Sequence, residues 1–216
     1  MDDYLRRTRW VAAMISFKLD EKHKNELRDL IPTINLASDS VNRRELLELC
    51  NIKVAAYKQD IDENIEANTV LEMVKQLAKL KMESYLSSKD FNKDITAASF
   101  DTLVEFNNKA IGKAKTEEEA YNTILSYSKQ SQEVHTGFSI YKNGKVITES
   151  ATSIVIFKEI TPEIAREYIA TGEWIGAAGS YRIQRKGLNL IEKIEGSITN
   201  VVGFPIEELI IKLKQF

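Results

Sequence analysis

Residues that bind transition metals or form disulfides are nearly absent from this sequence. Its 216 residues include one cysteine, Cys50, and two histidines, His23 and His135. A single cysteine excludes an intramolecular disulfide and a zinc site built from several cysteines, and two histidines exclude a histidine-rich metal centre. A chain without disulfides suits a reducing compartment, so we expect a cytoplasmic protein.

The sequence also lacks an excess of charge and a long hydrophobic run. Thirty Lys and Arg residues face 32 Asp and Glu residues, which gives a formal net charge of −2. Without a basic excess, we expect no nucleic-acid partner. The most apolar early run, residues 11–17, is far shorter than the roughly 20 residues that cross a bilayer. Asp2 and Asp3 precede it, so we expect neither a signal peptide nor a membrane span.

Apolar periodicity and turn residues predict an alternation of strands and helices. We expect strands at 33–38, 52–57, 95–106, 133–140, 145–148 and 153–158, and helices at 41–50, 68–85, 116–130, 161–170 and 206–214. Thr116, with Glu119 three residues later, is a capping box, and Asn143-Gly144 predicts a tight hairpin. Because hairpins and crossovers are both present, the pattern predicts a mixed α/β (α+β) architecture.

The first 32 residues differ in pattern from the rest of the chain. They are rich in Leu, Arg, Lys and Glu, with apolar residues at near-helical spacing, and Pro32 ends this segment. We interpret residues 1–32 as an N-terminal helical extension that packs on the domain or on a partner. The alternating strands and helices of residues 33–216 then form one domain.

Two places in the sequence carry polar residues that could bind a ligand. Ser38 and Ser40 lie in a polar turn between the first strand and the first helix, where free backbone N–H groups can hold a phosphate. A serine at this place is also a common helix cap. Asp101 interrupts an apolar strand, and a buried carboxylate is costly unless it is paired or binds a metal. A solvated carboxylate at a strand end is the alternative.

A glycine-rich connection at residues 172–187 is the second candidate region. It holds four of the nine glycines, and glycine lets the backbone approach a ligand closely. Within it, Gln184 can donate to and accept from a base edge, and Tyr181 offers a stacking face; a surface loop is the alternative. Cys50 follows leucines on the apolar side of a helix, so we expect a core residue, whereas we expect His135 to face outward from its strand.

The remaining chemistry-bearing residues are acids, lysines, arginines and small hydroxyls at the ends of predicted elements. The sequence has no glycine-rich P-loop and no GxGxxG motif. Carboxylate oxygens are ligands that Mg²⁺ prefers, and Lys and Arg neutralise phosphates. This set of residues is typical of a site that binds a polyphosphate together with Mg²⁺.

Several segments in this order resemble the Maf family of nucleoside triphosphate pyrophosphatases, relatives of the inosine triphosphatase fold. They are LASDSVNRRELLE at 36–48, DIDE at 60–63, Asp101-Thr102, Gly112-Lys113, Thr136-Gly137, Thr171-Gly172-Glu173, Ala178-Gly179, Tyr181, Ile183-Gln184, IEG at 194–196 and NVVGFP at 200–205. Each segment alone is a weak signal, but their order and spacing together are specific. The resemblance covers residues 33–216 and implies an elongated mixed sheet flanked by helices, in two lobes with a central cleft.

The resemblance implies metal-assisted hydrolysis of a nucleoside triphosphate, dTTP, UTP or a modified nucleotide, to a monophosphate and pyrophosphate. It implies a divalent cation, Mg²⁺ or Mn²⁺, and often a homodimer. The residues that it assigns are Asp101, Glu63 and Lys113 to catalysis, Glu63 and Asp101 to the metal, and Ser38, Ser40, Asn42, Arg43, Lys81, Thr102 and Gln184 to the substrate. Among these, Asp101 takes the place of the family's proton acceptor, and Thr102 and Gln184 fall at positions tied to substrate choice.

The chain departs from the family pattern at several of these segments. Val41-Asn42 stands where the signature has Pro-Arg, and Gly176-Ala177 stands where Asp-Lys is usual. Loss of a cleft cation weakens binding of a phosphate. A catalytically weakened nucleotide-binding or regulatory protein of the same fold is therefore the alternative. Under the enzymatic interpretation, we expect Arg182, Arg185 and Lys186 to restore positive charge.

Overall fold

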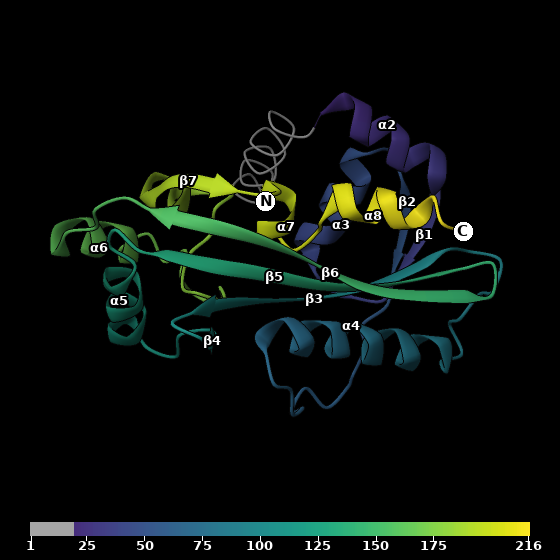
Figure 1. Ribbon diagram of the computed structural model, residues 1–216, viewed down its shortest axis with the longest axis horizontal. Helices are drawn as coiled ribbons and strands as arrows, with labels where there is room; N and C mark the ends of the chain where they lie inside the picture. Colours follow the sequence, from purple (N-terminus) through teal and green to yellow (C-terminus); the bar gives the residue numbers. More distant parts are fainter. Residues whose placement is uncertain (1–19) are drawn as a thin grey trace, which may run out of the picture.

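A computed structural model describes residues 20–216, and within them seven strands form one sheet (Figure 1). The strands are β1 (Thr33–Leu36), β2 (Lys53–Ala56), β3 (Ala97–Phe106), β4 (Lys109–Ile111), β5 (Ser131–Lys142), β6 (Lys145–Phe157) and β7 (Ile191–Glu195). Their order is β2-β1-β3-β5-β6-β7, and β4 pairs with β3. β1 is parallel to β2 and β3, whereas the other pairs are antiparallel. The predicted mixed α/β fold is confirmed.

Helices cover the sheet unevenly, as Figure 1 shows. They are α2 (Glu21–Leu30), α3 (Val41–Leu49), α4 (Val70–Leu86), α5 (Glu117–Ser126), α6 (Pro162–Ile169), α7 (Ile198–Val201) and α8 (Ile206–Leu213), with a 3₁₀ helix at Lys186–Leu190. The long helix α4 lies against one face of the sheet, and α2, α3 and α8 gather on the other face. α5 and α6 lie at the far end of the elongated sheet. The arrangement leaves α3 and α4 on opposite sides of β3.

Side-chain caps explain where several helices begin. The Thr116 hydroxyl accepts a hydrogen bond from the Glu119 backbone N–H at 3.1 Å, and the Glu119 carboxylate accepts one from the Lys115 backbone N–H at 2.8 Å. One otherwise free helix donor, the Glu119 N–H, is satisfied by Thr116, and the Glu119 carboxylate binds the backbone one residue before the cap, so the predicted cap at Thr116 is confirmed. The helix ends at Ser126, earlier than residue 130, because the chain then turns into β5.

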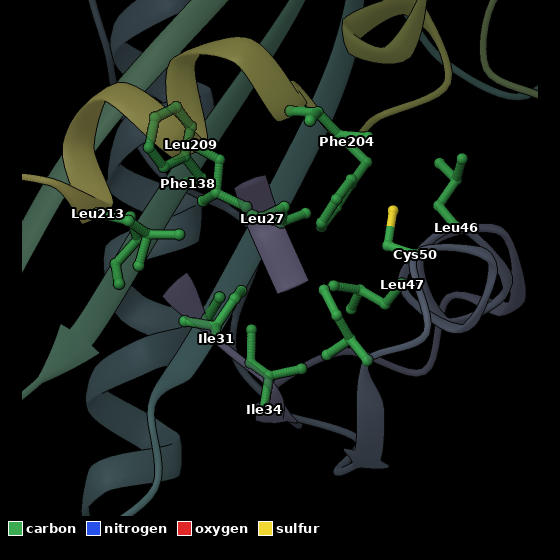
Figure 2. Close-up of a cluster of buried hydrophobic side chains, with 14 of the residues drawn as sticks. Leu27, Ile31, Ile34, Leu46, Leu47, Cys50, Phe138, Phe204, Leu209 and Leu213 are labelled. Carbon is green, nitrogen blue, oxygen red and sulfur yellow. The ribbon is translucent and has the colours of Figure 1, made fainter. Parts of the chain in front are cut away.

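Two large hydrophobic clusters occupy the two ends of the sheet. The first, in Figure 2, packs α2, α3 and α8 on the sheet, and it includes Leu27 and Ile31 at 0% and 1% exposure. Helix α2 thus shares a core with the strands that follow it, whereas residues 1–19 of the predicted extension lie outside the described residues. Cys50 is buried in the same cluster, which confirms the prediction of a core residue. The second cluster surrounds α5, α6 and the glycine-rich connection.

Two expectations about the β-sheet were wrong, and the prediction also missed four short elements, β4, β7, α7 and the 3₁₀ helix. Residues 145–148 and 153–158 belong to one strand, β6, which pairs with β5 from Lys145 to Ile156. β7 and the short helix α7 were not predicted, because a strand with three charged residues out of five and a single helical turn carry little periodicity. His135 does not face solvent: it is 3% exposed, and its ring contacts Thr152 and Glu105. Within residues 20–216, no helix is long and apolar enough to cross a membrane.

Candidate active site

The candidate site lies at a gap along one edge of β3. On this side, β1 pairs with Ala97 and Ala98, and β4 pairs only from Val104 onward. Between these two pairings, β3 has no neighbouring strand on this side among residues 20–216. Asp101 and Thr102 lie in the gap, and as successive residues of a strand they point to opposite faces of the sheet. Two functional groups therefore lie at this unpaired edge of β3, one on the α4 side and one on the α3 side.

On the α4 side, three charged side chains converge. The Lys81 ammonium lies 2.5 Å from an Asp101 carboxylate oxygen and 3.0 Å from a Glu63 carboxylate oxygen. Lys81 and Asp101 are largely buried, at 15% and 12% side-chain exposure, whereas Glu63 is 64% exposed on the extended segment before α4. The sequence-predicted trio Glu63, Lys81 and Asp101 is thus brought together in space. Asp101 is held inside the fold by its lysine, whereas Glu63 reaches the same lysine from an exposed segment.

A glycine allows α4 to lie this close to the sheet. Gly137 pairs with Asp101 across β3 and β5, and a Cβ atom there would lie 2.1 Å from the Val74 carbonyl oxygen. Any side chain at residue 137 would push α4 away from the strands. Since Lys81 is two turns further along α4, its distance to Asp101 depends on this contact.

On the α3 side, Arg43 organises the turn after β1. The Ser40 hydroxyl caps α3, and the Ser38 hydroxyl accepts hydrogen bonds from the Ser40 backbone N–H and from Arg43 Nη1 at 3.2 and 3.1 Å. Arg43 also donates through Nε to the Gly203 carbonyl at 2.9 Å and through Nη2 to the Thr102 hydroxyl at 3.0 Å. Three of its five N–H groups are therefore held by the protein, and two remain for a ligand.

Burial lowers the pKa of the Arg43 guanidinium to about 10, and the nearby carboxylates of Asp101 and Asp39 oppose this change. The side chain therefore stays charged at neutral pH. Its guanidinium also lies over the Phe100 ring, 5.4 Å from the ring centre. Burial and this cation–π contact fix Arg43 in one orientation between the turn and β3.

A cavity of about 190 Å³ opens beside Thr102 on the same face. It is lined by Asn42, Thr102, Val104, Val134, Gly176, Ala177, Ala178, Tyr181, Arg182, Ile183, Gln184, Val201 and Val202. Three sequence-predicted substrate residues, Asn42, Thr102 and Gln184, share this wall although they come from three distant segments. The other lining residues are mostly apolar. An apolar wall with a few polar groups suits a flat, polar-edged ring such as a nucleobase.

The glycine-rich connection forms one side of the cavity, as a structured loop and not as a solvated one. The Arg182 side chain donates through Nε to the Glu173 carbonyl at 3.0 Å and through Nη2 to the Ile175 carbonyl at 2.9 Å. Burial and the neighbouring Arg185 lower its pKa. The expected stacking face of Tyr181 is largely covered: the residue is 7% exposed, and its hydroxyl accepts a hydrogen bond from Gln132. Burial, the largest cause, raises the pKa of Tyr181.

Lys113 stands apart from both groups. It is exposed and forms an isolated β-bridge with Ala178, a residue of the cavity wall. Its backbone is thereby fixed at the rim of the cavity, while its side chain is in solvent. The structure places Lys113 beside the site without a direct contact to Asp101 or Glu63.

Sequence reasoning assigned no role to Thr136 and Asn200, which lie behind Thr102. The Thr136 hydroxyl is 3.0 Å from the Thr102 hydroxyl and donates to the Asn200 carbonyl at 3.2 Å. Both residues occur in the segments that carry the family resemblance, Thr136-Gly137 and NVVGFP. That membership was the available signal, but a separation of 64 positions hides the contact in the sequence.

The residues on the α4 side that could bind a divalent cation are two carboxylates, those of Asp101 and Glu63. Residues 20–216 contain no group of three or more His, Cys, Asp and Glu residues arranged to hold a metal ion. Asp101 and Glu63 supply two carboxylates that converge on one point, the Lys81 ammonium. Mg²⁺ commonly binds through one or two carboxylates together with substrate phosphates and water. Asp101 and Glu63 match that number of carboxylates, and here they share one positive group, the Lys81 ammonium.

Comparison with known proteins shows the family of this chain. The family described as Maf-like protein matches residues 33–216. The dTTP/UTP pyrophosphatase of Thermosipho melanesiensis is 39% identical over 176 residues, which cover 82% of this chain and 93% of the relative. The dTTP/UTP pyrophosphatase of Bacillus cereus strain AH187 is 35% identical over 184 residues, 85% of this chain and 95% of the relative. The chain belongs to the Maf-like protein family.

Proposed function

We propose that this protein hydrolyses nucleoside triphosphates, with uracil and thymine nucleotides as substrates, to the monophosphate and pyrophosphate. The observation that carries the proposal is the pairing of Asp101 with Lys81 at the open edge of β3, next to the cavity lined by Thr102. The names of the two relatives, dTTP/UTP pyrophosphatases, support the same reaction and the same bases.

The proposed reaction breaks the bond between the α-phosphorus and the oxygen that bridges it to the β-phosphorus. A water oxygen attacks the α-phosphorus, its proton passes to the Asp101 carboxylate, and pyrophosphate leaves with the bridging oxygen. Negative charge accumulates on this leaving group. We propose that Lys81 and Arg43, which lie at the gap, and Lys113, at the rim of the cavity, stabilise that charge through charge-assisted hydrogen bonds.

We further propose that Asp101 and Glu63 hold a divalent cation, Mg²⁺ or Mn²⁺, jointly with the triphosphate. The support is that both carboxylates contact one positive group, the Lys81 ammonium, and that Mg²⁺ prefers oxygen ligands. Such a cation neutralises phosphate oxygens when it is bound. Ser38, Ser40 and Arg43 are proposed to hold the phosphates from the α3 side, where the turn presents hydroxyls and a fixed guanidinium.

The cavity beside Thr102 is proposed to take the base, with Asn42, Thr102 and Gln184 as its polar contacts. Its volume of about 190 Å³ and its apolar wall support this assignment. Asn42 stands where the family signature has an arginine, so this chain lacks one positive charge at the cavity. That difference is the reason to test turnover and binding separately.

The experiment is a pyrophosphate-release assay with dTTP, UTP, CTP, ATP, GTP and 7-methyl-GTP, each with Mg²⁺ and with Mn²⁺. The matched control is Asp101→Asn, which keeps the shape of the side chain and removes its charge. We expect dTTP and UTP to be hydrolysed and the control to be slower by about 10²- to 10⁴-fold, the usual contribution of a general base. No pyrophosphate above the control for any nucleotide would overturn the proposal. Tight binding of UTP without release would then indicate the alternative, a nucleotide-binding relative.

The family resemblance also leads us to propose that the protein is a cytoplasmic homodimer. Light scattering after size exclusion measures the mass directly, and a dimer has twice the 24.6 kDa of one chain. A mass equal to one chain across micromolar concentrations would refute the dimer. Cell fractionation tests the location independently.

A further inference from the structure

A directed chain of hydrogen bonds runs behind the cavity. Arg43 Nη2 donates to Thr102 Oγ1 at 3.0 Å, Thr102 Oγ1 lies 3.0 Å from Thr136 Oγ1, and Thr136 Oγ1 donates to the Asn200 carbonyl at 3.2 Å. The four residues come from α3, β3, β5 and α7, so the chain connects the turn after β1 with the cavity wall. Of these residues, Thr102 itself lines the cavity.

The direction of this chain follows from the chemistry of its two ends. A carbonyl oxygen only accepts, so the single hydroxyl hydrogen of Thr136 points to Asn200. Thr136 must then accept from Thr102, which uses the single hydroxyl hydrogen of Thr102. A guanidinium only donates, so Arg43 occupies one lone pair of the Thr102 oxygen. The Thr102 hydroxyl has one lone pair left, and it can offer the cavity an acceptor only.

The acceptor at the end of the chain is itself held in place. The Asn200 carbonyl also accepts from the Gly203 backbone N–H at 2.8 Å. The Asn200 side chain donates to the Val134 carbonyl at 2.9 Å and to the Ser153 hydroxyl at 3.0 Å. Thr136 and Asn200 are both 0% exposed, so water does not compete for these groups. The role of the Thr102 hydroxyl as an acceptor toward the cavity is thus fixed by the buried structure before any ligand binds.

We propose that Thr136 is a positioning residue that makes the cavity selective for a base with a ring N–H, by holding the Thr102 hydroxyl as an acceptor. Uracil and thymine present an N–H at ring position 3, whereas cytosine presents a lone pair there. A fixed acceptor forms a hydrogen bond with the N–H of uracil or thymine. Opposite cytosine, its lone pair faces the lone pair of the ring nitrogen, and no hydrogen bond forms. The inference rests on the proposed function, because it requires the base to lie in this cavity.

The test measures selectivity in the Asp101→Asn background, so that it does not depend on turnover. Dissociation constants of UTP and CTP are determined by calorimetry for this parent and with Thr136→Val added. We expect the parent to prefer UTP, and the added valine to reduce the ratio of the two constants by about tenfold, since loss of a buried hydrogen bond has this magnitude. With valine at residue 136, the Thr102 hydroxyl is free to rotate and to donate to cytosine.

Thr136→Ser is the matched control, because it keeps the hydroxyl and removes one methyl group. We expect serine to retain the UTP preference. A purely structural role of Thr136 would weaken UTP and CTP binding equally and leave the ratio unchanged, and that result would overturn the inference, as would a parent without preference. Thr136→Ala replaces the valine variant if valine prevents folding. Because pyrophosphate release tests the proposed reaction separately, failure of the two ideas is distinguishable.

Discussion

The ammonium of Lys81 lies 2.5 Å from the carboxylate of Asp101, and the two side chains are only 15% and 12% exposed. Removing the cation leaves a largely buried carboxylate without its charged partner. We expect Lys81→Met to lower the free energy of unfolding by about 3 kcal/mol, the lower end of the cost of breaking a buried ion pair. Urea denaturation of the purified variant measures this change.

A double-mutant cycle separates the charge pair from simple loss of packing. Adding Asp101→Asn to Lys81→Met removes the unpaired charge, so we expect the double variant to be more stable than Lys81→Met alone. Glu63→Gln breaks the second contact of Lys81, but Glu63 is 64% exposed, so we expect a loss of about 1 kcal/mol or less. Equal losses for Lys81→Met and Glu63→Gln would contradict the assignment of Asp101 as the principal partner.

The contact between Gly137 and helix α4 makes a second prediction. A Cβ atom at Gly137 would lie 2.1 Å from the Val74 carbonyl oxygen, whereas one at Gly112 would have no atom within 4 Å. We expect Gly137→Ala to destabilise the fold by at least about 3 kcal/mol, at or above the usual range for overpacking. For a chain of this length, that corresponds to a melting temperature lower by about 6–12 °C. Gly112→Ala is the control. A similar decrease in melting temperature for both variants would show that helix α4 does not pack against residue 137.

Burial of Cys50 makes stability depend on alkaline pH. Burial raises the pKa of the Cys50 thiol to about 11, whereas an unfolded cysteine titrates near a pKa of about 8.5. Between these values the folded state binds more protons than the unfolded state, so the free energy of unfolding falls as pH rises. We expect the stability advantage of the wild type over Cys50→Ala to be constant below pH 8 and to shrink through this window. The tyrosines with raised pKa values are present in both proteins, so their contribution cancels in the difference. A pH-independent difference would contradict the burial.

Sequence patterns located most elements because their signals are local. The caps at Ser40 and Thr116, for example, depend on residues within three positions of each other. The single strand β6 was predicted as two because the polar residues Glu149 and Ser150 interrupt its apolar pattern. In the structure, Glu149 pairs with Lys212 at 2.9 Å and with Lys75 at 3.6 Å, and these ion pairs lower its pKa. A tertiary contact thus compensates a charge that the local pattern disfavours.

The candidate site shows the same division between local and distant information. The family resemblance placed Asp101 and Thr102 in the site, but only the pairing of β3 with β1 and β4 shows that they face opposite sides of one gap. The acceptor role of the Thr102 hydroxyl depends on Thr136 and Asn200, whose contacts join segments far apart in the chain. The direction of these hydrogen bonds is set by the Arg43 guanidinium at one end and the Asn200 carbonyl at the other. These groups are distant in the sequence, so residue types and spacing do not predict it.

The side chain of Arg182 lines the cavity and donates to the carbonyls of Glu173 and Ile175. Its backbone N–H donates to the Tyr168 hydroxyl at 3.0 Å. Arg182 therefore holds the loop that includes the cavity-lining residue Ala177 in its observed shape. We expect Arg182→Ala to raise the KM for UTP about tenfold, as expected for loss of about 1.4 kcal/mol of binding free energy, with a smaller effect on kcat.

Arg185→Ala is the matched control for this variant, because Arg185 is exposed and does not line the cavity. If positive charge near the substrate were the important property, both substitutions would weaken UTP binding. If the loop shape is important, only Arg182→Ala has the effect, and Arg182→Lys does not restore KM, since lysine lacks the planar fork that reaches both carbonyls. Steady-state kinetics of the three variants at two salt concentrations distinguish the two, because a long-range charge effect weakens with salt and a local hydrogen-bond effect does not.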